Sequence, residues 1–521
     1  MMNAHRTTGV SGTAAGGLLA VGSIVGAGLL VVPSVASSLR TVHVPEMQLV
    51  DTADSPLGDG TALVFGGTGV PIPPPQFVDA ADTLYLQPLG FTGTAQPAFI
   101  PNEFYPTTGV KSLELGASLG QDQQIMVSDI EGQIAAGGVG PENPVVVFAY
   151  SQGADAASLS MSQLAQQGVP SDDVHFVLTA DVQNPNGGFL NTFDFPAGNT
   201  SAFTAFGAPF LPPTPSDLYP TDIYTLEYDG LADFPHYTTN LVSDLNAMLG
   251  FFLAHFTYQD LAADQINNAI LLPGSEALTG EGLTDYFLIP NDNLPILEPL
   301  LLVPGIGQPL YDLLEPDTQI LVNLGYGSIT EGWNQGPANV PTTFGLYPDI
   351  NPTQLSDTLS NGWQQGITNA LHDLQHPISY QDQVAPLLPF ANSLYTFGVA
   401  PENPSFTDVV DGLLRSVGFP LSDVTLSSSP TDIIDDISST LSNEYSSTLA
   451  FADSINVLLT GLPAYDANIV TDQLDAGNLL GAVLDPMSAN TALVPYDALL
   501  GAAQALFATL GTVVNLTELF S

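Results

Sequence analysis

Ser151 stands between an apolar run and an alanine-rich segment, in the stretch VVVFAYSQGADAAS of residues 145–158. The run predicts a buried strand and the following segment predicts a helix. Such a strand-to-helix turn exposes a serine hydroxyl above the sheet and lets the amide of Gln152 point at a developing negative charge. The spacing is A-x-S-x-G, because Ala149 stands where glycine is usual. By itself this short motif fits a nucleophilic serine or an ordinary helix-capping serine.

A serine nucleophile needs an orienting acid, which follows the serine along the chain in hydrolases built on this turn. Asp229 follows the predicted strand DIYTLEY (222–228), at the edge where parallel α/β sheets bind ligands. Gly230 permits a turn there. Asp233 is the nearby alternative, and we predict Asp229 as the acid.

The nucleophile also needs a base, and five histidines follow it: His175, His236, His255, His372 and His376. His175 opens a predicted strand, so we expect it at the end of the sheet opposite Ser151. His255 closes a predicted helix over 238–256, where a loop can fold back over the sheet. His236 is the rival base, although it lies only seven positions after Asp229. From the residues alone, a helix-terminal histidine favoured by the helix dipole explains His255 equally well.

An oxyanion needs a second amide donor, usually from the loop after an early strand. The glycine-rich stretch VFGGTGVP (64–71) offers Gly67 or Thr68. The alternative is a phosphate-binding loop. No lysine follows, no GxGxxG spacing is present, and the proline-rich continuation is not expected to start a helix. We therefore predict an oxyanion hole at Gly67, Thr68 and Gln152.

His372 and His376 lie four positions apart in ALHDLQHP, a spacing that can hold a metal on a helix. However, no glutamate between them could activate water, and no third ligand is evident. A solvated helix end before Pro377 is the better interpretation. We predict no metal and no cofactor.

The composition restricts the function further. The 521 residues carry a net charge of −49, and the only basic residues are Arg6, Arg40, Lys111 and Arg415. Four scattered cations cannot track a phosphate backbone, which excludes nucleic-acid binding and argues against anionic substrates. Cysteine is absent, which excludes a thiol nucleophile and a disulfide framework. Hydrophobic residues make up 45% of the chain and charged residues 11%, as in a globular protein rather than a disordered one.

The first 40 residues predict a signal peptide or an N-terminal membrane anchor. Residues 7–39 carry no charge and contain the apolar stretch GGLLAVGSIVGAGLLVV. Small residues follow, and cleavage after Ala36 is expected if the segment is a signal peptide. Because the apolar stretch approaches the ~20 residues that span a bilayer, an uncleaved anchor is the alternative. Either way, we predict export, and a secreted or cell-envelope-associated protein.

The following elements predict an α/β fold with a mainly parallel sheet and helices on both faces. Strands are expected at 61–67, 143–150, 174–180 and 222–228, and helices at 118–138, 152–167 and 238–256. Beyond about Asp260, the Leu-, Pro- and Asn-rich sequence predicts loops and short helices over a core. After Pro377 a run of helices is expected, up to Ser521.

Several segments resemble, in order, the PE-PPE domain of mycobacterial exported proteins: FGGTGVPIP, VVVFAYSQGADAAS, ADVQNPNGG, LEYDGLADFPHYTTNLVSDLNAMLGFFLAHFTY and GPANVPTTFGLYP. That family looks like a cutinase-related branch of the serine α/β hydrolases. The resemblance covers roughly residues 55–375. It implies a cutinase-like α/β-hydrolase fold, a triad of Ser151, Asp229 and His255, and an oxyanion hole at Gly67, Thr68 and Gln152.

The chain departs from the family pattern in two ways. Ala149 replaces the first glycine of the turn, which puts the turn geometry in question. No N-terminal PE or PPE helical module is found, and a signal-like segment stands in its place. The dedicated secretion pathway of those proteins is therefore not implied.

Together these features predict an exported serine esterase or lipase that hydrolyses carboxylic esters with apolar acyl chains through an acyl-enzyme. The first alternative is an acyltransferase that moves acyl chains onto a cell-envelope glycolipid such as a trehalose ester. The second is a non-catalytic surface protein. The expected partner is a lipid or ester substrate, and an association with the membrane or cell envelope is left open. Residues 378–521 form a helical extension, expected as a layer that completes the core or as a lid or apolar groove for acyl chains.

Overall fold

The computed structural model describes residues 57–398 and 430–520. These residues all belong to one unit, which comprises Leu49–Ser521. The predicted signal peptide or anchor at 1–40 lies outside the described residues.

The apolar runs of the sequence form the central strands. These are β1 (Thr61–Phe65), β3 (Val145–Tyr150), β4 (Val174–Thr179) and β5 (Thr221–Leu226). Every residue of β3 is buried, as a continuous apolar run in the middle of a covered sheet requires. The four predicted strands therefore exist, with ends shifted by one or two residues.

Three further strands complete the sheet: β2 (Thr94–Pro97), β6 (Ile270–Leu271) and β7 (Thr284–Ile289). The expectation that only loops and short helices follow Asp260 was wrong at β6 and β7. β7 pairs with β5 over six residues, from Thr221–Thr284 to Leu226–Ile289. The leucine- and proline-rich composition around β7 conceals this strand, because its pairing partner lies some 60 residues away in the chain.

The sheet has seven strands in the order β2-β1-β3-β4-β5-β7-β6. All neighbouring pairs are parallel except β6 and β7, which are antiparallel. From β1 the chain continues to β2 on one side, and β3 pairs with the other side of β1. The direction in which successive strands are added to the sheet reverses between β1 and β3. The carboxyl ends of these two strands therefore form the switch point at which open α/β sheets bind ligands.

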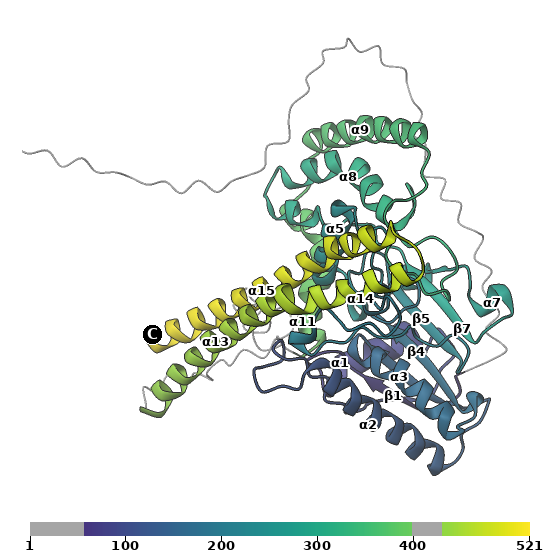
Figure 1. Cartoon of the computed structure of the whole chain (residues 1–521). Helices are drawn as coiled ribbons and strands as arrows, with labels where there is room; N and C mark the ends of the chain where they lie inside the picture. The colour runs from purple at the N-terminus through teal and green to yellow at the C-terminus, as the bar shows by residue number, and fades with distance from the viewer. Residues whose placement is uncertain (1–56, 399–429, 521) are drawn as a thin grey trace, which may run out of the picture. The chain divides into compact units, whose positions relative to one another are not determined.

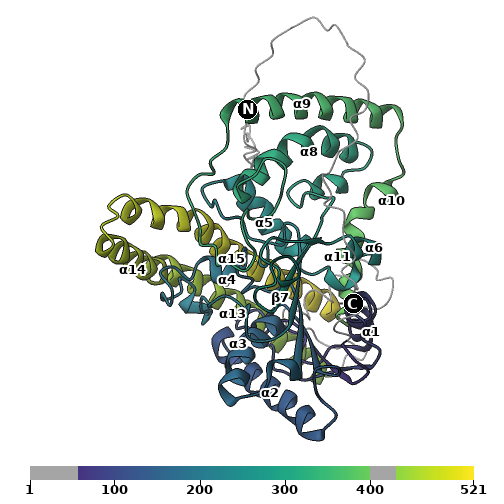
Figure 2. The same cartoon turned by 90° about the vertical axis from the view of Figure 1, so that its right-hand side faces the viewer.

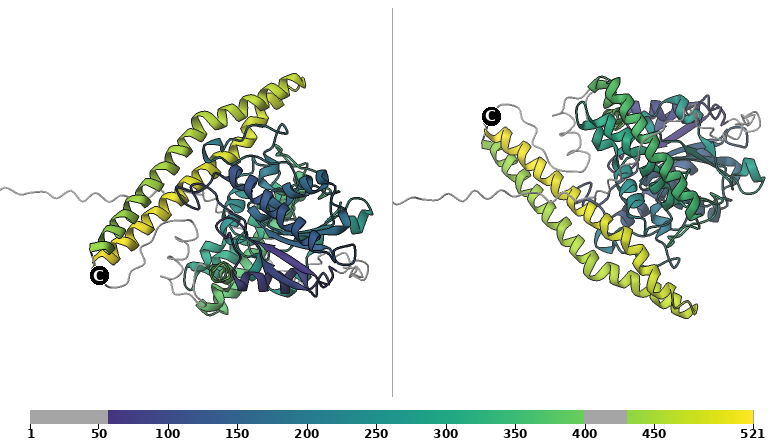
Figure 3. Two further views of the ribbon diagram at one scale, coloured as in Figure 1. Left: turned by 90° about the horizontal axis from the view of Figure 1, so that it is seen from below. Right: turned by 90° about the horizontal axis from the view of Figure 1, so that it is seen from above.

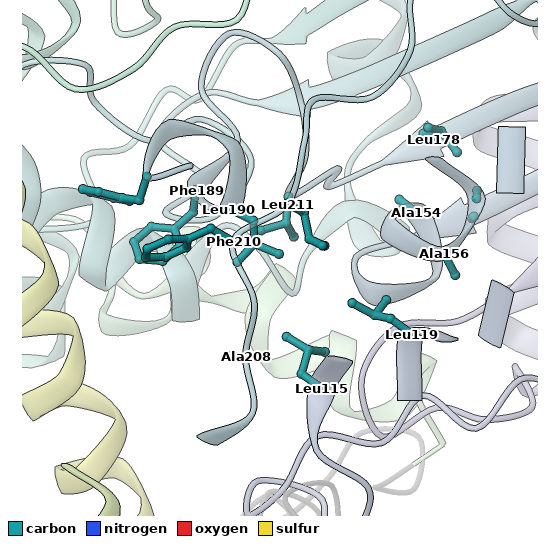
Figure 4. Packing of buried hydrophobic residues seen from close by; sticks show 14 of the residues in the cluster. Leu115, Leu119, Ala154, Ala156, Leu178, Phe189, Leu190, Ala208, Phe210 and Leu211 are labelled. Carbon is teal, nitrogen blue, oxygen red and sulfur yellow. The ribbon is translucent and has the colours of Figure 1, made fainter. Parts of the chain in front are cut away.

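One face of the sheet is covered by α2 (Leu115–Ala136) and α3 (Gln152–Gln167). Their apolar side chains share a large core with Val145, Val147 and Ala149 of β3. Figure 4 shows part of this core, with Leu115 and Leu119 of α2 near Ala154 and Ala156 of α3. The side chains alternate along β3, so the odd-numbered residues all point to this face.

The other face is covered by α1 (Pro75–Ala81), η2 (Asp82–Leu86), η5 (Tyr258–Asp260) and α6 (Ala263–Asn267). A second core on this side contains Val146, Phe148 and Tyr150 of β3. Helix α1 begins at Pro75, so the expectation that the proline-rich stretch starts no helix was wrong. Proline is tolerated at the first helical position, where its missing amide hydrogen has no partner to lose. With helices on both faces, the predicted α/β-hydrolase fold class is confirmed.

Three longer helices follow the sheet's later strands. Helix α8 (Gly307–Asn323) packs against both α5 (Leu241–Leu253) and α9 (Pro352–Gln375) (Figure 2). Asn240 caps α5, and its side chain accepts hydrogen bonds from the amides of Val242 and Ser243. The observed α5 ends two residues before His255, which leaves this histidine in the turn that follows the helix.

The C-terminal region is helical, as predicted. It contains α10 (Tyr380–Gln383), α11 (Leu388–Thr396), α13 (Pro430–Asn456), η9 (Val457–Gly461), α14 (Leu462–Asp475) and α15 (Gly481–Phe520). Helices α13 and α15 lie side by side (Figures 1 and 3). Side chains of η9, α14 and α15, among them Val457, Tyr465 and Tyr496, belong to the same core as α2 and α3. This region therefore packs directly on the core formed by the sheet, α2 and α3.

Short helical segments connect the remaining elements: η3 (Ser171–Asp173), α4 (Phe189–Thr192), η4 (Thr204–Phe206), α7 (Glu276–Thr279), η6 (Glu298–Leu302), η7 (Leu324–Tyr326) and η8 (Ala385–Leu387). Within residues 57–398 and 430–520, no helix combines the length and apolar character needed to cross a membrane.

Candidate active site

Ser151 occupies a strained turn between β3 and α3. Its φ of 54° and ψ of −123° lie in a region that residues other than glycine rarely adopt. The amide of Ser151 donates to the carbonyl of Thr179 at the end of β4, which holds the turn to the sheet. The residue is only 8% exposed. Strain of this kind persists where the surrounding structure enforces it, and it concentrates at functional sites.

Two glycines allow the backbone to pack closely around the serine. A methyl group at Gly153 would overlap the carbonyl oxygen of Gly66, and one at Gly67 would lie 2.9 Å from Cβ of Ser151. The loop after β1 therefore touches the turn directly. Ala149 is fully buried in the core between β3 and α3, and the turn forms with the alanine in place.

His255 reaches the serine from the turn after α5. Its amide donates to the carbonyl of Gly250 (2.9 Å), and its carbonyl accepts the hydroxyl of Tyr150 (2.7 Å). The backbone is thus held from the α5 side and from the end of β3. Nε2 of His255 lies 2.8 Å from Oγ of Ser151, and the histidine is 1% exposed.

Asp229 completes the chain of hydrogen bonds from beyond the end of β5. Both of its carboxylate oxygens lie 2.9 Å from Nδ1 of His255. Oδ1 also accepts the amides of Leu231 (2.9 Å) and Ala232 (3.2 Å), and the residue is fully buried. Because Nδ1 faces a carboxylate it carries a proton, which leaves Nε2 to accept the proton of the serine hydroxyl.

Tyr258 also belongs to the site, although it was not predicted from the sequence as a site residue. Its hydroxyl donates to Oδ2 of Asp229 (2.7 Å) and accepts the amide of Leu226 (2.8 Å). Burial, together with the charge of Asp229, raises the pKa of Tyr258 well above its ordinary value, so the hydroxyl stays a donor. Its position three residues after His255, in the segment HFTY, was the available signal.

The rival acid and base lie elsewhere. Oδ2 of Asp233 accepts the amide of Tyr228 (2.9 Å), and burial raises the pKa of Asp233 well above its ordinary value, with the charges of Glu227 and Asp229 adding to the effect. The backbone of His236 bonds to Asn334 and Gly345, and burial lowers the pKa of its ring. The structure thus brings Asp229 and His255, rather than these two residues, to Ser151.

The other three of the five histidines that follow Ser151 along the chain lie elsewhere in the fold. His175 lies near the start of β4, and its Nε2 is 2.7 Å from Oδ2 of Asp222 at the start of β5, at the opposite end of the strands. His372 and His376 lie at the end of α9, where Nδ1 of His376 donates to the carbonyl of His372 (3.0 Å). In the part of the chain that the structure describes, no group of three or more acidic or histidine side chains is arranged to hold a metal ion.

The predicted oxyanion residues are linked to one another. Oγ1 of Thr68 donates to Oε1 of Gln152 (2.8 Å). Nε2 of Gln152 donates to Oδ2 of Asp122 (2.9 Å) and to Oγ of Ser118 (3.1 Å). Through these bonds the loop after β1 and the first residue of α3 are fixed together beside Ser151.

Asn102 holds the glycine-rich loop in place. Its Nδ2 donates to the carbonyls of Gly66 and Val70 (both 3.0 Å), and its carbonyl accepts the amide of Gly69 (2.8 Å). The amide of Asn102 donates to Oδ1 of Asp122 (3.1 Å). Asp122 therefore accepts a hydrogen bond from Asn102, which holds the loop, with Oδ1, and one from Gln152 with Oδ2. Neither Asn102 nor Asp122 was predicted from the sequence as a site residue.

A cavity of about 250 Å³ opens beside Ser151 and His255. Most of its lining is apolar: Val70, Phe104, Leu115, Val182, Phe189, Leu190, Phe203, Phe206, Ala208, Leu231, Phe251, Phe252, Phe256, Phe390, Leu394, Phe397, Leu499 and Leu500. Thr68 and Gln152 also face it, so the predicted oxyanion donors and the serine share one space.

An acidic side chain, Asp155, also lines the cavity, one turn of α3 beyond Ser151. Burial raises the pKa of Asp155 well above its ordinary value, and the nearby carboxyl of Asp181 raises it further. The pKa of Asp181 is itself raised by burial to about 6. Burial and the neighbouring carboxyl of Asp181 thus both favour the protonated form of Asp155.

Comparisons with known proteins find one domain family and several relatives. The model of the PE-PPE domain matches residues 92–327. The uncharacterized PPE family protein PPE28 of Mycobacterium tuberculosis is 35% identical over 449 residues, which cover 85% of this chain and 64% of that protein. Esterase PE16 of the same organism is 40% identical over 311 residues, which cover 58% of this chain and 54% of that protein. The chain thus spans a little over half to just under two thirds of the length of these relatives.

Among solved structures, a cutinase-like protein from Cryptococcus sp. aligns with 34% of this chain and 80% of its own, with 16% identity and a TM-score of 0.21. The PE family protein PE3 of M. tuberculosis is 33% identical over 363 residues, which cover 68% of this chain and 73% of that protein. Because the chain covers 73% of PE3 at 33% identity, and the domain match includes Ser151, Asp229 and His255, the chain belongs to the PE-PPE domain family.

Proposed function

We propose that the protein is a serine esterase or lipase that hydrolyses carboxylic esters with apolar acyl chains. One observation carries this proposal. The hydrogen-bonded series Ser151–His255–Asp229 ends in a serine that faces an apolar cavity. The name of the relative PE16, an esterase, supports the same class of reaction.

The reaction follows from the geometry. Oγ of Ser151 attacks the ester carbonyl carbon while Nε2 of His255 takes the hydroxyl proton. The tetrahedral intermediate collapses, and His255 returns the proton to the departing alcohol oxygen, leaving an acyl-enzyme on Ser151. Water then attacks the acyl carbon in the same way and releases the carboxylic acid. Asp229 keeps the ring oriented and stabilises the imidazolium.

The oxyanion of both intermediates needs donors beside Ser151. We assign this role to the amide of Gln152 and to an amide of the loop at Gly67 and Thr68. Thr68 and Gln152 face the cavity, and Gly67 packs against Cβ of Ser151. Preorganised backbone donors in a water-poor site are the largest single contribution to many acyl transfers.

Labelling with a fluorophosphonate tests the nucleophile. The parent protein should be labelled, and Ser151→Ala and His255→Ala should not. Ser160→Ala is the matched control, because this serine lies on α3 with its hydroxyl bonded to the carbonyl of Ala156. Labelling that survives Ser151→Ala removes the assignment, and an unlabelled parent favours a non-catalytic surface protein.

An acyltransferase is the second candidate, because the acyl-enzyme forms in a site that admits little water. Ser151 and His255 are nearly buried, and the adjoining cavity is apolar. A sugar or lipid hydroxyl then competes with water for the acyl group. Product analysis with p-nitrophenyl esters, with and without trehalose, separates the two reactions. Acylated trehalose indicates transfer, and free acid alone indicates hydrolysis.

A further inference from the structure

The cavity beside Ser151 is built partly by helices far outside the matched domain. The family model ends at residue 327. Helix α11 adds Phe390, Leu394 and Phe397 (the residue after its end) to the lining, and helix α15 adds Tyr496, Leu499 and Leu500. A wall that closes the apolar side of the site thus comes from chain segments 60 to 170 residues downstream of the domain.

Tyr496 connects this wall to the acid loop. Its hydroxyl donates to the carbonyl of Gly230 (2.8 Å), the residue after Asp229. Its ring lies 4.7 Å from the ring of Phe189 and 5.6 Å from that of Phe234. Tyr496 therefore lines the cavity with its ring and supports the backbone beside Asp229 with its hydroxyl.

The part of α15 around Tyr496 is anchored to the hydrolase core. Oγ1 of Thr238 donates to the carbonyl of Ser488 (2.7 Å), and Oγ of Ser488 donates to the carbonyl of Gly345 (2.9 Å). Helix α15 also packs against α5, the helix that precedes His255. Helix α15 is therefore fixed relative to His255 as well as to Asp229.

We propose that α15 and α11 form the acyl-chain wall of the site, and that Leu499, Leu500 and Tyr496 determine which chain lengths fit. This inference rests on the proposed esterase function and assigns the C-terminal helices a role in it. An alkyl chain is the fitting occupant, because Leu and Phe side chains make up most of the wall. The finite volume of the cavity, about 250 Å³, also limits the length of the chain that fits.

Substitutions at Leu500 test the wall. Rates with p-nitrophenyl esters from acetate to palmitate should show an optimum that moves to shorter chains in Leu500→Trp and to longer chains in Leu500→Ala. Each methylene that no longer fits should lower kcat/KM about tenfold. Val494→Trp is the matched control, because Val494 lies on the same helix but is 38% exposed and outside the lining.

Tyr496→Phe separates the two roles of Tyr496. It removes only the bond to Gly230, so kcat should fall several-fold for every ester while the chain-length optimum stays. Tyr465→Phe is the matched control, because its buried hydroxyl donates to the carbonyl of Phe193 (3.1 Å) from α14, outside the cavity. If the two variants lower Tm equally and both leave kcat unchanged, Tyr496 has no positioning role.

The outcomes distinguish this inference from the proposed function. Suppose that fluorophosphonate still labels Ser151 and that the Leu500 variants keep the parent's dependence of rate on chain length. The proposed role of α15 and α11 as the acyl-chain wall is then wrong, and the esterase assignment stands. If the parent is inactive, binding of the neutral alcohol decan-1-ol to Ser151→Ala, measured by calorimetry, decides the matter without catalysis. Adding Leu500→Trp to Ser151→Ala should weaken this binding at least tenfold. Equal binding by the single and the double variant, or no binding by Ser151→Ala, would contradict the proposed acyl-chain wall.

Discussion

The hydroxyl of Tyr258 lies 2.7 Å from Oδ2 of Asp229, and it is held there by the amide of Leu226, which donates to the same hydroxyl. Asp229 is therefore tied to the last residue of β5 through a side chain that follows His255 by three positions. The segment after α5 supplies both His255 and a support for Asp229. This arrangement fixes the carboxylate relative to the imidazole that it orients.

Tyr258→Phe should lower kcat by about 10- to 100-fold with little change in KM. A hydrogen bond to a charged group contributes about 1.5–3 kcal/mol, and its loss leaves Nδ1 of His255 as the remaining donor near Oδ2 of Asp229. Steady-state kinetics with a p-nitrophenyl ester measures the effect. Tyr85→Phe is the control, because the hydroxyl of Tyr85 bonds only the carbonyl of Tyr258 and is one step further from Asp229. Equal kinetics in Tyr258→Phe and the parent would show that the bond serves stability alone.

Asp122→Asn should slow catalysis without weakening substrate binding. In asparagine an NH2 donor replaces one of the two carboxylate oxygens, which accept hydrogen bonds from Nε2 of Gln152 and from the backbone N–H of Asn102. One of these two hydrogen bonds is therefore lost, because two donors then face each other. Losing one oxyanion donor costs about 100- to 1,000-fold in kcat, and a displaced donor should cost part of this. Fluorophosphonate labelling rates and KM together measure the effect.

Asp129→Asn provides the control for this experiment, because it changes an acid on the same helix, α2, that is only partly buried. A fall in kcat that is equal in both variants would remove the special role of Asp122.

Ala149→Gly should leave kcat within about threefold of the parent and lower the free energy of unfolding by about 1 kcal/mol. The methyl group of Ala149 is buried in the core on the α3 side, and the strained turn at Ser151 forms with it present. Glycine removes this packing and adds freedom to the unfolded chain. Urea unfolding and ester kinetics measure the two effects. A large rise in kcat would show instead that the alanine hinders the turn.

Glu298→Gln should make the protein more stable at pH 8 than the parent. Burial raises the pKa of Glu298 from its ordinary 4.5 to about 8. The folded state then holds a proton that the unfolded state releases, so this stability is fully present below about pH 4.5 and is lost as the pH rises toward 8. The free energy of unfolding falls by up to about 1.4 kcal/mol per pH unit in this range. Glutamine does not titrate, so the substitution removes this dependence on pH.

Urea unfolding at pH 5 and pH 8 checks this prediction, with the exposed Glu276→Gln as control. The difference in unfolding free energy between the two pH values should shrink only in Glu298→Gln. Identical differences in both variants and the parent would contradict the buried, protonated state of Glu298.

Local sequence patterns determined the elements that carry the nucleophile. The apolar run before Ser151 and the small residues after it specify a buried strand and a helix, because side-chain periodicity and burial are properties of neighbouring residues. The ranges of β1, β3, β4, β5, α2, α3 and α5 were predicted to within a few residues. The order of serine, acid and base along the chain also follows from the sequence.

Only the tertiary structure decided which side chains meet. From the residues alone, Asp233 and His236 were open alternatives, and the resemblance favoured Asp229 and His255, which the structure places at Ser151. Tyr258, Asn102 and Asp122 act through bonds to residues 20 to 36 positions away, and β7 and Tyr496 contact partners more distant still. Such contacts depend on how whole elements pack, and no local pattern encodes the packing of elements so distant in the chain.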